Sequence, residues 1–564
     1  MDPRDEGLRA GWFESVLPDA VQITVPYPVE SEASGINEPE PANVVWYQRD
    51  FEVPDGWQSR VVLRIGACDH WARVYINGLE VGQHRGGYAP FAFDIEHALI
   101  PGTNRVTVRV QDSMSWTQPR GKQAGTTRWP IDYDSVTGIW QTVWLEPLPR
   151  VSIESTAFAF SHASGELTYS AFFSGQVDGE LLVNLSRGGQ PVATATTGVD
   201  LRSEARVEFR LPDGVLWSPD SPALYDVELK LVNKAADEVD EARSYVALRE
   251  VSVEEGELRL NGQKLYLRGV LDQGYYPGGW YTARTDDEFR ADVELTLAMG
   301  FNCARKHQKA EDPRYLYWAD KLGLMVWSEM PSGRVFSTEL VESLTSEWID
   351  LVKRDRGHPC VVAWVPFNES WGVWHQAERP QQRRFVDAIA ALTKALDASR
   401  LVVGNDGWEY SSGDLWTLHL YAEEDAENDG ISRRLGEIIR DPGRSVTHEY
   451  GGRVRMGALP DADITGLPIL LTECGGVGFG RYSDEDFSYG ELPKTEQALE
   501  AHIRQIADWI HAAEQLQGFV WTQLTDVQQE INGLAYFDRH PKLPTATLRE
   551  IFRHIGSSTG QETL

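Results

Sequence analysis

Two glutamates stand at the ends of apolar runs in this sequence, where they could act on one substrate. Glu369 follows the run 361–367, and Glu473 follows the run 468–472. Both runs are typical of buried strands, and a carboxylate at the exit of a core strand is costly unless a function uses it. Two carboxylates that face one substrate are the groups that glycoside hydrolysis requires. The pair predicts this chemistry; taken alone, each glutamate has a structural strand-end role as its alternative.

The elements that would position these glutamates alternate between strands and helices after Asn261-Gly262. The capping box Thr285-Asp286-Asp287-Glu288 predicts the start of one helix, and further helices are predicted near 339–354, 381–396 and 495–513. Eight strands with helices between them predict a (β/α)8 TIM barrel, whose sites lie at the C-terminal strand ends. Glu369 and Glu473 end strands four and seven of this series. The predicted strands cover residues 264–270, 301–306, 324–327, 361–366, 401–404, 415–420, 469–472 and 518–522.

The residues before the barrel have the pattern of two all-β domains. Short alternating runs recur over residues 1–150, and Asn77-Gly78 after one of them is a strong hairpin signal. These runs predict an N-terminal jelly-roll β-sandwich. Further alternating strands over residues 151–252 predict an immunoglobulin-like β-sandwich. The barrel then takes residues 253–564, and the fold class is multidomain β and α/β.

The acidic composition excludes several classes of partner. With 85 Asp and Glu against 53 Lys and Arg, the formal net charge is −32 at pH 7. This charge argues against nucleic acid and against an anionic membrane surface. No apolar run reaches the roughly 18 residues that suggest a transmembrane helix. The charged N-terminal segment lacks the apolar core of a signal peptide, so we expect a cytoplasmic protein.

The cysteines give no sign of a metal or redox site. Cys68, Cys303, Cys360 and Cys474 are scattered and form no CxxC motif, so we expect buried free thiols. We predict no required metal and no cofactor.

Motifs along nearly the whole sequence resemble glycoside hydrolase family 2, the family of β-galactosidases, β-glucuronidases and β-mannosidases. The first domain carries the family-like stretches 46–51 and 137–141, and the barrel carries 299–305. Asn368-Glu369-Ser370 resembles the acid/base motif of the family, and Thr472-Glu473 resembles its nucleophile motif. Together these motifs are specific, although each alone is weak.

The resemblance implies a retaining mechanism. Glu473 would attack the anomeric carbon to form a glycosyl-enzyme, and Glu369 would protonate the leaving oxygen and later activate water. For this the carboxyl groups must lie roughly 5–5.5 Å apart. Glu369 must also start protonated and Glu473 ionised, so their surroundings must separate their pKa values.

The resemblance also implies substrate-binding roles around the pair. Asn368 would hold the hydroxyl next to the anomeric carbon, Tyr421 would orient the nucleophile, and Trp521 would form a platform under the sugar ring. His419, two residues before Tyr421, belongs to the same candidate group. Arg305 would support the nucleophile electrostatically. The alternatives are a turn-forming role for Asn368, rim packing for Tyr421 and a structural ion pair for Arg305.

The loops after strands one and two depart from the well-studied β-galactosidases. The usual His-rich loop is replaced by residues 271–281, and His307 falls one place before the usual histidine position. Asp272, Lys306 and His307 are candidates for binding sugar hydroxyls, with loop or rim charges as the alternative for Asp272 and Lys306. In the last loop Leu534 stands where the Asn-x-Lys motif of β-glucuronidases has lysine. This counts against a uronic acid, unless Lys306 or Lys309 substitutes.

We therefore expect a retaining exo-β-glycosidase that releases a terminal neutral sugar. A galactose-configured sugar is the first expectation, with a galactofuranoside or an arabinoside as unusual ring forms. A β-glucuronidase or β-mannosidase is the alternative within the family, and an inactive carbohydrate-binding protein is the alternative of another class. The expected partner is a small-molecule glycoside or oligosaccharide, and a homodimer is expected from the resemblance alone.

Overall fold

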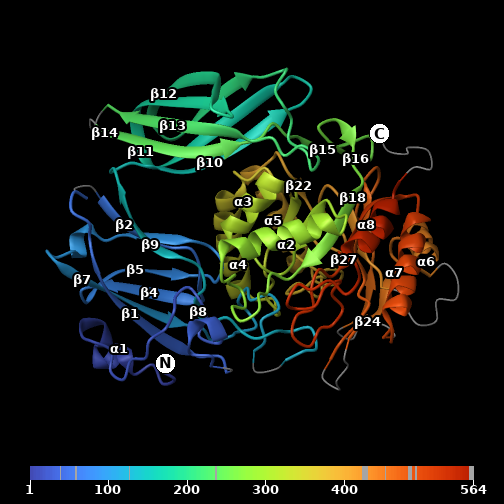
Figure 1. Cartoon of the computed structure of the whole chain (residues 1–564), viewed down its shortest axis with the longest axis horizontal. Helices are drawn as coiled ribbons and strands as arrows, with labels where there is room; N and C mark the ends of the chain where they lie inside the picture. The colour runs from blue at the N-terminus through green and yellow to red at the C-terminus, as the bar shows by residue number, and fades with distance from the viewer. Residues whose placement is uncertain are drawn as a thin grey trace.

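The computed structural model describes residues 1–564 except 39, 58–59, 126–127, 235–237, 422–429, 451–452, 481–485, 490–491 and 558–564. Three parts follow one another along the chain (Figure 1). The N-terminal strands, blue in the figure, and the middle sheet, green, lie beside a C-terminal barrel coloured yellow to red.

The N-terminal part is the predicted β-sandwich. One sheet has the order β1-β7-β4-β5 and the other β6-β2-β9, with antiparallel pairing throughout. Alternating side chains such as Val61, Leu63 and Val108 fill the space between the sheets. Asn77 and Gly78, both at positive φ, connect β4 to β5 as the hairpin signal predicts.

The strands of this sandwich, with the short pair β3 and β8, are β1 (Val44–Glu52), β2 (Arg60–Ile65), β3 (Cys68–Asp69), β4 (Trp71–Ile76), β5 (Leu79–Arg85), β6 (Phe91–Asp94), β7 (Thr103–Gln111), β8 (Gly138–Ile139) and β9 (Val143–Leu148). Its short helical turns are α1 (Gly7–Ala10), η1 (Trp12–Glu14), η2 (Glu32–Ser34) and η3 (Glu96–Ala98).

One long hairpin organises the middle part, which is all-β as predicted. β11 (Glu166–Arg187) pairs with β12 (Gln190–Arg210) along nearly its whole length. The first half of β11 also pairs with β10 (Ile153–Ser161), and its second half pairs with β13 (Tyr225–Asn233), which is followed by β14 (Glu238–Val246). The inward-facing residues of these strands form one core. A small sheet then leads into the barrel: β15 (Val251–Glu254), β16 (Glu257–Leu260) and β17 (Gln263–Lys264).

The C-terminal part is the predicted TIM barrel. Its curled sheet has the order β22-β21-β20-β19-β18-β27-β26-β23, and all pairings are parallel. Each of the eight predicted strands corresponds to one strand of this sheet. They are β18 (Leu267–Asp272), β19 (Cys303–Lys306), β20 (Met325–Glu329), β21 (Val361–Val365), β22 (Leu401–Val402), β23 (Trp416–His419), β26 (Ile469–Gly475) and β27 (Leu516–Thr522).

Helices cover the outside of this sheet. Three that the sequence did not single out are α3 (Pro313–Leu322), α6 (Gly430–Arg440) and α8 (Thr545–His554). The first helix begins where the capping box predicts, but Thr285 makes no side-chain cap bond, and Glu288 accepts from the backbone N–H of Arg284 instead. The remaining elements are α2 (Asp286–Ala298), α4 (Thr338–Asp355), α5 (Pro380–Leu396), α7 (Glu496–His511) and the hairpin β24 (Ser445–Tyr450) with β25 (Arg453–Met456).

Hydrogen bonds fix the sandwich against the barrel. In the connection between β7 and β8, the backbone N–H groups of Arg120 and Gly121 donate to the Ser332 carbonyl at 3.2 and 3.1 Å. On another side, buried Glu347 of α4 accepts from the backbone N–H of Tyr88 at 2.5 Å and of Ala89 at 3.2 Å. The sandwich therefore contacts the loop that follows β20 and the helix α4.

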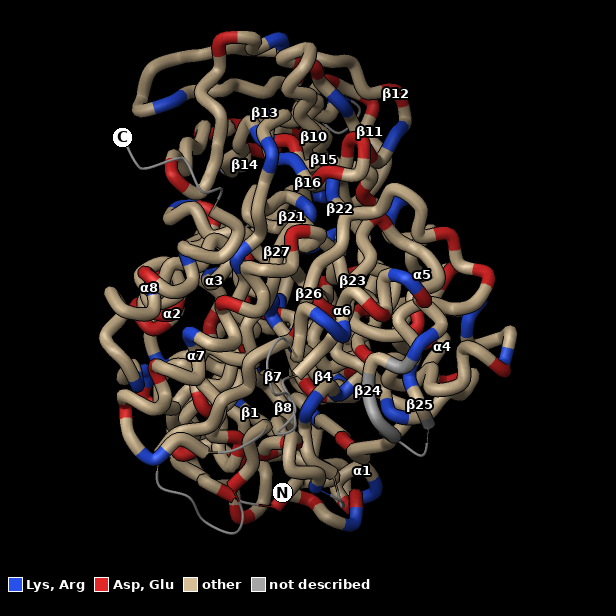
Figure 2. The backbone as a smooth tube through the Cα atoms, turned by 90° about the vertical axis from the view of Figure 1, so that its right-hand side faces the viewer, with Lys and Arg blue, Asp and Glu red and all other residues tan. Residues whose placement is uncertain are grey.

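Acidic residues are distributed over all three parts of the chain (Figure 2). Among the residues described, no helix has both the length and the apolar character needed to cross a membrane. The four cysteines are buried and free.

Candidate functional site

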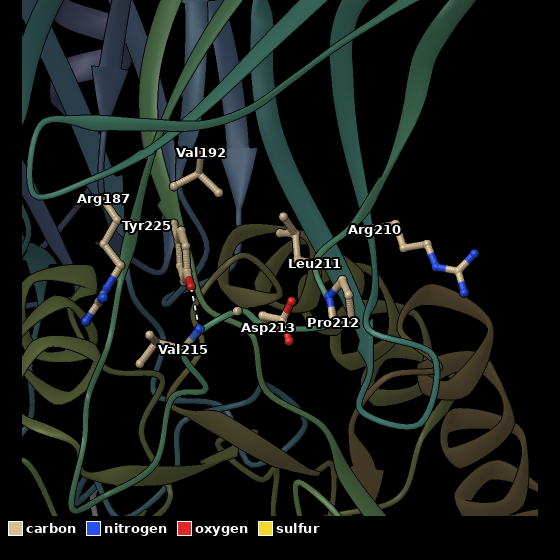
Figure 3. A pocket seen from close by; sticks show the side chains of 9 residues that line it. Arg187, Val192, Arg210, Leu211, Pro212, Asp213, Val215 and Tyr225 are labelled. Carbon is tan, nitrogen blue, oxygen red and sulfur yellow. Dashed lines mark hydrogen bonds between the residues drawn. The ribbon is translucent and has the colours of Figure 1, made fainter.

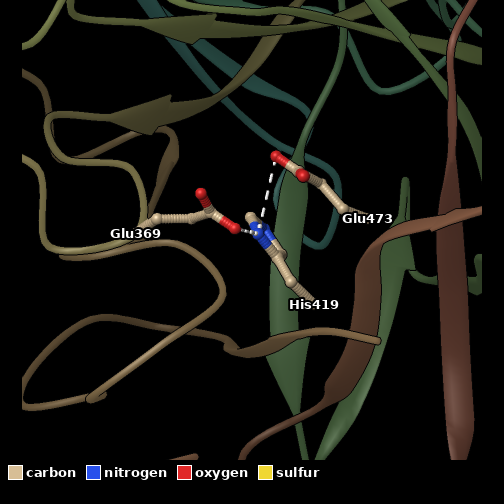
Figure 4. Close-up of side chains that lie close together, drawn as sticks. All are labelled: Glu369, His419 and Glu473. Atoms are coloured by element: carbon tan, nitrogen blue, oxygen red, sulfur yellow. Dashed lines mark hydrogen bonds and ion pairs between the residues drawn. The ribbon is translucent and has the colours of Figure 1, made fainter. Parts of the chain in front are cut away.

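The barrel brings the two glutamates together. Glu369 follows β21 and Glu473 lies in β26, and the two strands end on the same side of the sheet. One carboxylate oxygen of each, together with a ring nitrogen of His419, lie within 4.8 Å of one another (Figure 4). This separation is close to the roughly 5–5.5 Å of a nucleophile and acid/base pair.

His419, the last residue of β23, lies between the glutamates. Its Nδ1 is 2.8 Å from Glu369 Oε1 and 3.5 Å from Glu473 Oε1, while its Nε2 is 3.1 Å from Asp406 Oδ2. Burial alone would lower the pKa of His419, but the charges of Glu473 and Asp406 outweigh it and raise the pKa to about 10. His419 is therefore an imidazolium at neutral pH, donating through both nitrogens.

Arg305, near the end of β19, contacts several polar residues of the site at once. This fully buried guanidinium donates to Glu473 Oε1 at 3.0 Å and to Asn368 Oδ1 at 2.6 Å. It also pairs with Glu329 and Asp406, each at 2.9 Å. Arg305 thus fixes the nucleophile candidate and the neighbour of the acid/base candidate with one side chain.

The two glutamates have opposite pKa shifts. Burial raises the pKa of Glu369, and the charge of Glu473 raises it further, against the lowering effect of His419. Burial would also raise the pKa of Glu473, but the charges of His419 and Arg305 outweigh it and lower the pKa. One carboxyl therefore holds its proton more readily than the other, which is the condition for acid catalysis beside a nucleophile.

The backbone at Glu369 is strained. Glu369 and Ser370 have φ values of 50° and 59°, in the left-handed region that non-glycine residues rarely adopt. The Ser370 hydroxyl donates to Glu409 at 2.6 Å, and its N–H donates to the Asn405 side chain at 2.9 Å. These bonds hold a conformation that aims Glu369 at its partner.

Tyr421 contacts the nucleophile candidate directly. Its hydroxyl donates to Glu473 Oε2 at 2.7 Å and lies 3.1 Å from Thr522 Oγ1. Its ring stacks on Tyr489, with centroids 3.8 Å apart and planes 5° apart. The structure therefore brings Asn368, Tyr421, His419 and Arg305 to the glutamate pair.

Trp521 is not brought to the pair. Its ring is fully buried and packs on Phe552 of α8, with centroids 5.1 Å apart. Strand alternation explains this: Trp521 shares the direction of Phe519, which also packs on Phe552, whereas Thr522 points to Tyr421. The expected platform under the sugar is corrected to a core residue between β27 and the outer helices.

The candidates after strands one and two form ion pairs with their own neighbours. Lys306 Nζ lies 2.7 Å from both Asp272 and Glu311, and Lys309 Nζ lies 2.8 Å from Glu311. All four side chains are buried. The charges of Lys306 and Lys309 are thus already compensated within the protein.

His307 contacts a different carboxylate. Its Nδ1 is 3.2 Å from Glu329, and burial lowers its pKa well below the usual range. It is therefore neutral, in contrast to His419.

Two carboxylates that the sequence did not single out support the site. Glu329 ends β20, and Asp406 follows the predicted strand five; both pair with Arg305. Burial raises the pKa of Glu329 to about 7, against the lowering effect of Arg305. For Asp406 burial has the same raising effect, but the charges of Arg305 and His419 outweigh it and lower the pKa. Both residues stand at strand ends, so the signal that marked the glutamate pair could have found them.

The donor atoms of Glu369, His419 and Glu473 also have the spacing of metal ligands. A metal needs an unprotonated imidazole nitrogen. The pKa of about 10 keeps both nitrogens of His419 protonated, and the Arg305 charge lies beside them. The group fits proton transfer better than cation binding, and the absence of a required metal stays a prediction.

Two open hollows lie elsewhere. One of about 460 Å³ is lined by middle-domain residues including Arg187, Arg210 and Tyr225, whose hydroxyl accepts from the Val215 N–H (Figure 3). The other, of about 420 Å³, lies between that domain and residues 394–401 of the barrel part. Neither includes Glu369 or Glu473 among its lining residues.

Family models match all three parts of the chain. Residues 1–149 match the sugar-binding domain of glycosyl hydrolases family 2, residues 169–249 match a further model of glycosyl hydrolases family 2, and residues 251–440 match its TIM barrel domain.

Curated relatives carry two activities. A β-galactosidase of Thermoanaerobacter pseudethanolicus is 28% identical over 345 residues, which are 58% of this chain and 45% of the relative. A β-glucuronidase of Felis catus is 27% identical over 461 residues, which are 73% of this chain and 67% of the relative. The chain thus spans less than half the length of that β-galactosidase.

Solved structures share the fold. The β-glucuronidase of Ruminococcus gnavus superposes with a TM-score of 0.79 at 20% identity, over 98% of this chain and 95% of the other. The β-glucuronidase of Bifidobacterium dentium, complexed with coumarin-3-O-glucuronide, gives 0.80 at 21% identity, over 96% and 94% of the two chains.

Proposed function

The chain belongs to glycosyl hydrolase family 2 and is a glycoside hydrolase; on this premise we propose that it is a retaining exo-β-glycosidase, with Glu473 as nucleophile and Glu369 as acid/base. The opposite pKa shifts of two carboxyls whose oxygens lie within 4.8 Å carry this proposal. They match the two roles that the reaction needs.

In the first step Glu473 attacks the anomeric carbon while Glu369 gives its proton to the leaving oxygen. The lowered pKa of Glu473 keeps this carboxylate ionised, and the 2.7 Å bond from Tyr421 orients it. The raised pKa of Glu369 favours the protonated form, which gives its proton to the leaving oxygen.

In the second step the ionised Glu369 takes a proton from water, which attacks the glycosyl-enzyme and releases Glu473. His419 supports this exchange because its Nδ1–H, 2.8 Å from Glu369, stabilises the carboxylate that the first step leaves behind. Asn368, held by Arg305 at 2.6 Å, is placed for the hydroxyl next to the anomeric carbon.

The identity of the released sugar is a further part of this proposal, and there are two candidates. A galactose-configured neutral sugar is supported by Leu534 in the place of the β-glucuronidase lysine and by the internal pairing of Lys306 and Lys309. Glucuronic acid is supported by relatives that are β-glucuronidases.

A panel of nitrophenyl glycosides tests the proposal: β-galactopyranoside, β-galactofuranoside, β-glucuronide, β-mannoside and the two α-L-arabinosides. Wild type should cleave at least one, and Glu473→Gln should lose roughly 10⁴-fold or more in kcat, because the amide is no nucleophile. Glu496→Gln, an exposed change on α7, is the matched control and should retain activity. Equal hydrolysis by wild type and Glu473→Gln would overturn the proposal.

A further inference from the structure

Lys122 of the N-terminal part lies in a connection that packs at the mouth of the barrel. Lys122 lies in the connection between β7 and β8, next to Gly121, whose N–H donates to Ser332 at 3.1 Å. Gly121 has a φ of +59°, and a Cβ there would lie 2.1 Å from the carbonyl oxygen of Gln308. The connection therefore packs directly on the loop after β19, one residue from His307.

Lys122 is buried without an anionic partner. Lys122 as a residue is 6% exposed, and its Nζ atom lies 5.9 Å from the centre of the Tyr133 ring. Within the part of the chain that the structure describes, the ammonium makes neither a hydrogen bond nor an ion pair. An ammonium without a counter-charge is available to pair with an anionic ligand.

Five other buried cations around the barrel mouth differ from Lys122 because each has a carboxylate partner, whereas Arg120 of the same connection donates to the Met114 carbonyl at 2.8 Å and stacks on Trp116. The pairs are Arg305 with Glu329, Asp406 and Glu473; Lys306 with Asp272 and Glu311; Lys309 with Glu311; Arg334 with Asp132; and Lys542 with Asp526. Among the residues that the structure describes, Lys122 is therefore a lysine whose charge is left available to an anionic group on a substrate.

The charge of Lys122 acts on the catalytic side of the barrel. Burial lowers the pKa of His307, and the charge of Lys122 lowers it further. The same charge opposes the effect of burial on the pKa of Glu369. The connection that carries Lys122 packs on Gln308, beside His307, so its charge lies on the same side of the barrel as the acid/base.

We propose that Lys122 binds the carboxylate of a uronic acid at the glycon position, so that the chain hydrolyses β-uronides such as a β-glucuronide. The inference rests on the proposed function and selects one of its two sugars. A carboxylate suits this position better than a hydroxyl because charge-assisted hydrogen bonds are roughly twice as strong as neutral ones. The sandwich would then supply the cation that Leu534 does not supply from the last barrel loop.

Kinetics on paired substrates test this assignment. Wild type should cleave nitrophenyl β-glucuronide, and Lys122→Met should lose roughly 100-fold in kcat/KM on it, the loss of one hydrogen bond to a charged group. Lys122→Arg should retain part of the activity. Lys230→Met, which removes an exposed lysine of the middle domain, is the matched control and should behave like wild type.

A binding measurement separates this proposal from the catalytic one. Sodium D-glucuronate should raise the Tm of wild type and of Glu473→Gln, but not that of Lys122→Met. Hydrolysis of a neutral glycoside without hydrolysis of the glucuronide would leave the catalytic proposal intact and overturn this one. So would a kcat/KM on glucuronide that Lys122→Met leaves within about threefold of wild type, or an absence of glucuronate binding by wild type.

Discussion

At the scale of residues, the site depends on one histidine between two carboxyl groups. His419 is charged because Glu473 and Asp406 outweigh its burial, and its own charge lowers the pKa of both Glu369 and Glu473. Asp406 in turn lies between His419 and Arg305. The charge of His419 therefore helps to set the pH range in which Glu369 is protonated while Glu473 is ionised.

Replacing His419 by Gln should move both limbs of the pH profile of kcat/KM upward by about 1 pH unit. Removing a positive charge disfavours the ionised form of each carboxyl, so both pKa values rise. Glu473 then ionises later on the acidic limb, and Glu369 keeps its proton longer on the basic limb. The measurement is kcat/KM across pH, beside the exposed change His97→Gln. Limbs that stay in place, or move to lower pH, would contradict this assignment.

At the scale of elements, the loop after β22 (Leu401–Val402) sets the position of the histidine. Gly407 has a φ of +87°, and a Cβ there would lie 2.4 Å from the His419 ring. The neighbouring Asp406 accepts from Thr472 of β26 at 2.8 Å and from the imidazole of His419. The loop after β22 therefore places Gly407, which has no side chain, and the carboxylate of Asp406 against the imidazole ring of His419.

Gly407→Ala should displace His419 and lower kcat roughly tenfold or more, with a loss of stability. Gly35→Ala is the matched control: its φ is +81° and no atom lies within 4 Å of a Cβ there. In the control, the substitution costs only the free energy of placing alanine in the left-handed conformation, about 1–2 kcal/mol. The measurements are Tm and kcat of both variants. Equal effects in the two would show that contact with the ring is unimportant.

The sequence predicted the barrel strands and the glutamate pair because both are local signals. Parallel strands buried on both faces are continuous apolar runs, and a charged residue at the end of such a run is conspicuous. The partners of Arg305 come from different strands, so its role depends on barrel closure. The direction of Trp521 depends on strand alternation against the outer helices, which motif resemblance did not supply. Lys122 and Tyr489 lie in irregular segments without a periodic pattern.

At the scale of the whole molecule, a buried carboxyl joins the sandwich to the barrel. Glu347 of α4 accepts two backbone N–H bonds from residues 88 and 89, and burial raises its pKa to about 7. Burial raises the pKa of Glu30, inside the sandwich, to about 8. The folded protein therefore binds these protons more tightly than the unfolded chain does.

The stabilisation linked to Glu347 should be complete below pH 4.5, its ordinary pKa, and lost as pH rises through about 7. Glu347→Gln keeps the accepting oxygen and cannot ionise. Its stability relative to wild type should therefore increase between about pH 5 and pH 8, by roughly 3 kcal/mol at most. The measurement is unfolding by denaturant at several pH values, with the exposed Glu342→Gln on the same helix as control. A difference that does not change with pH would refute this linkage.

The proposed reaction is double displacement at Glu473 with Glu369 as acid/base. Proton NMR of the anomeric signals during hydrolysis of the best substrate tests it most directly. After double displacement, the released sugar should first appear in the same anomeric configuration as the substrate and equilibrate only later. First appearance of the opposite anomer would mean direct displacement by water, and would contradict the roles assigned to both glutamates.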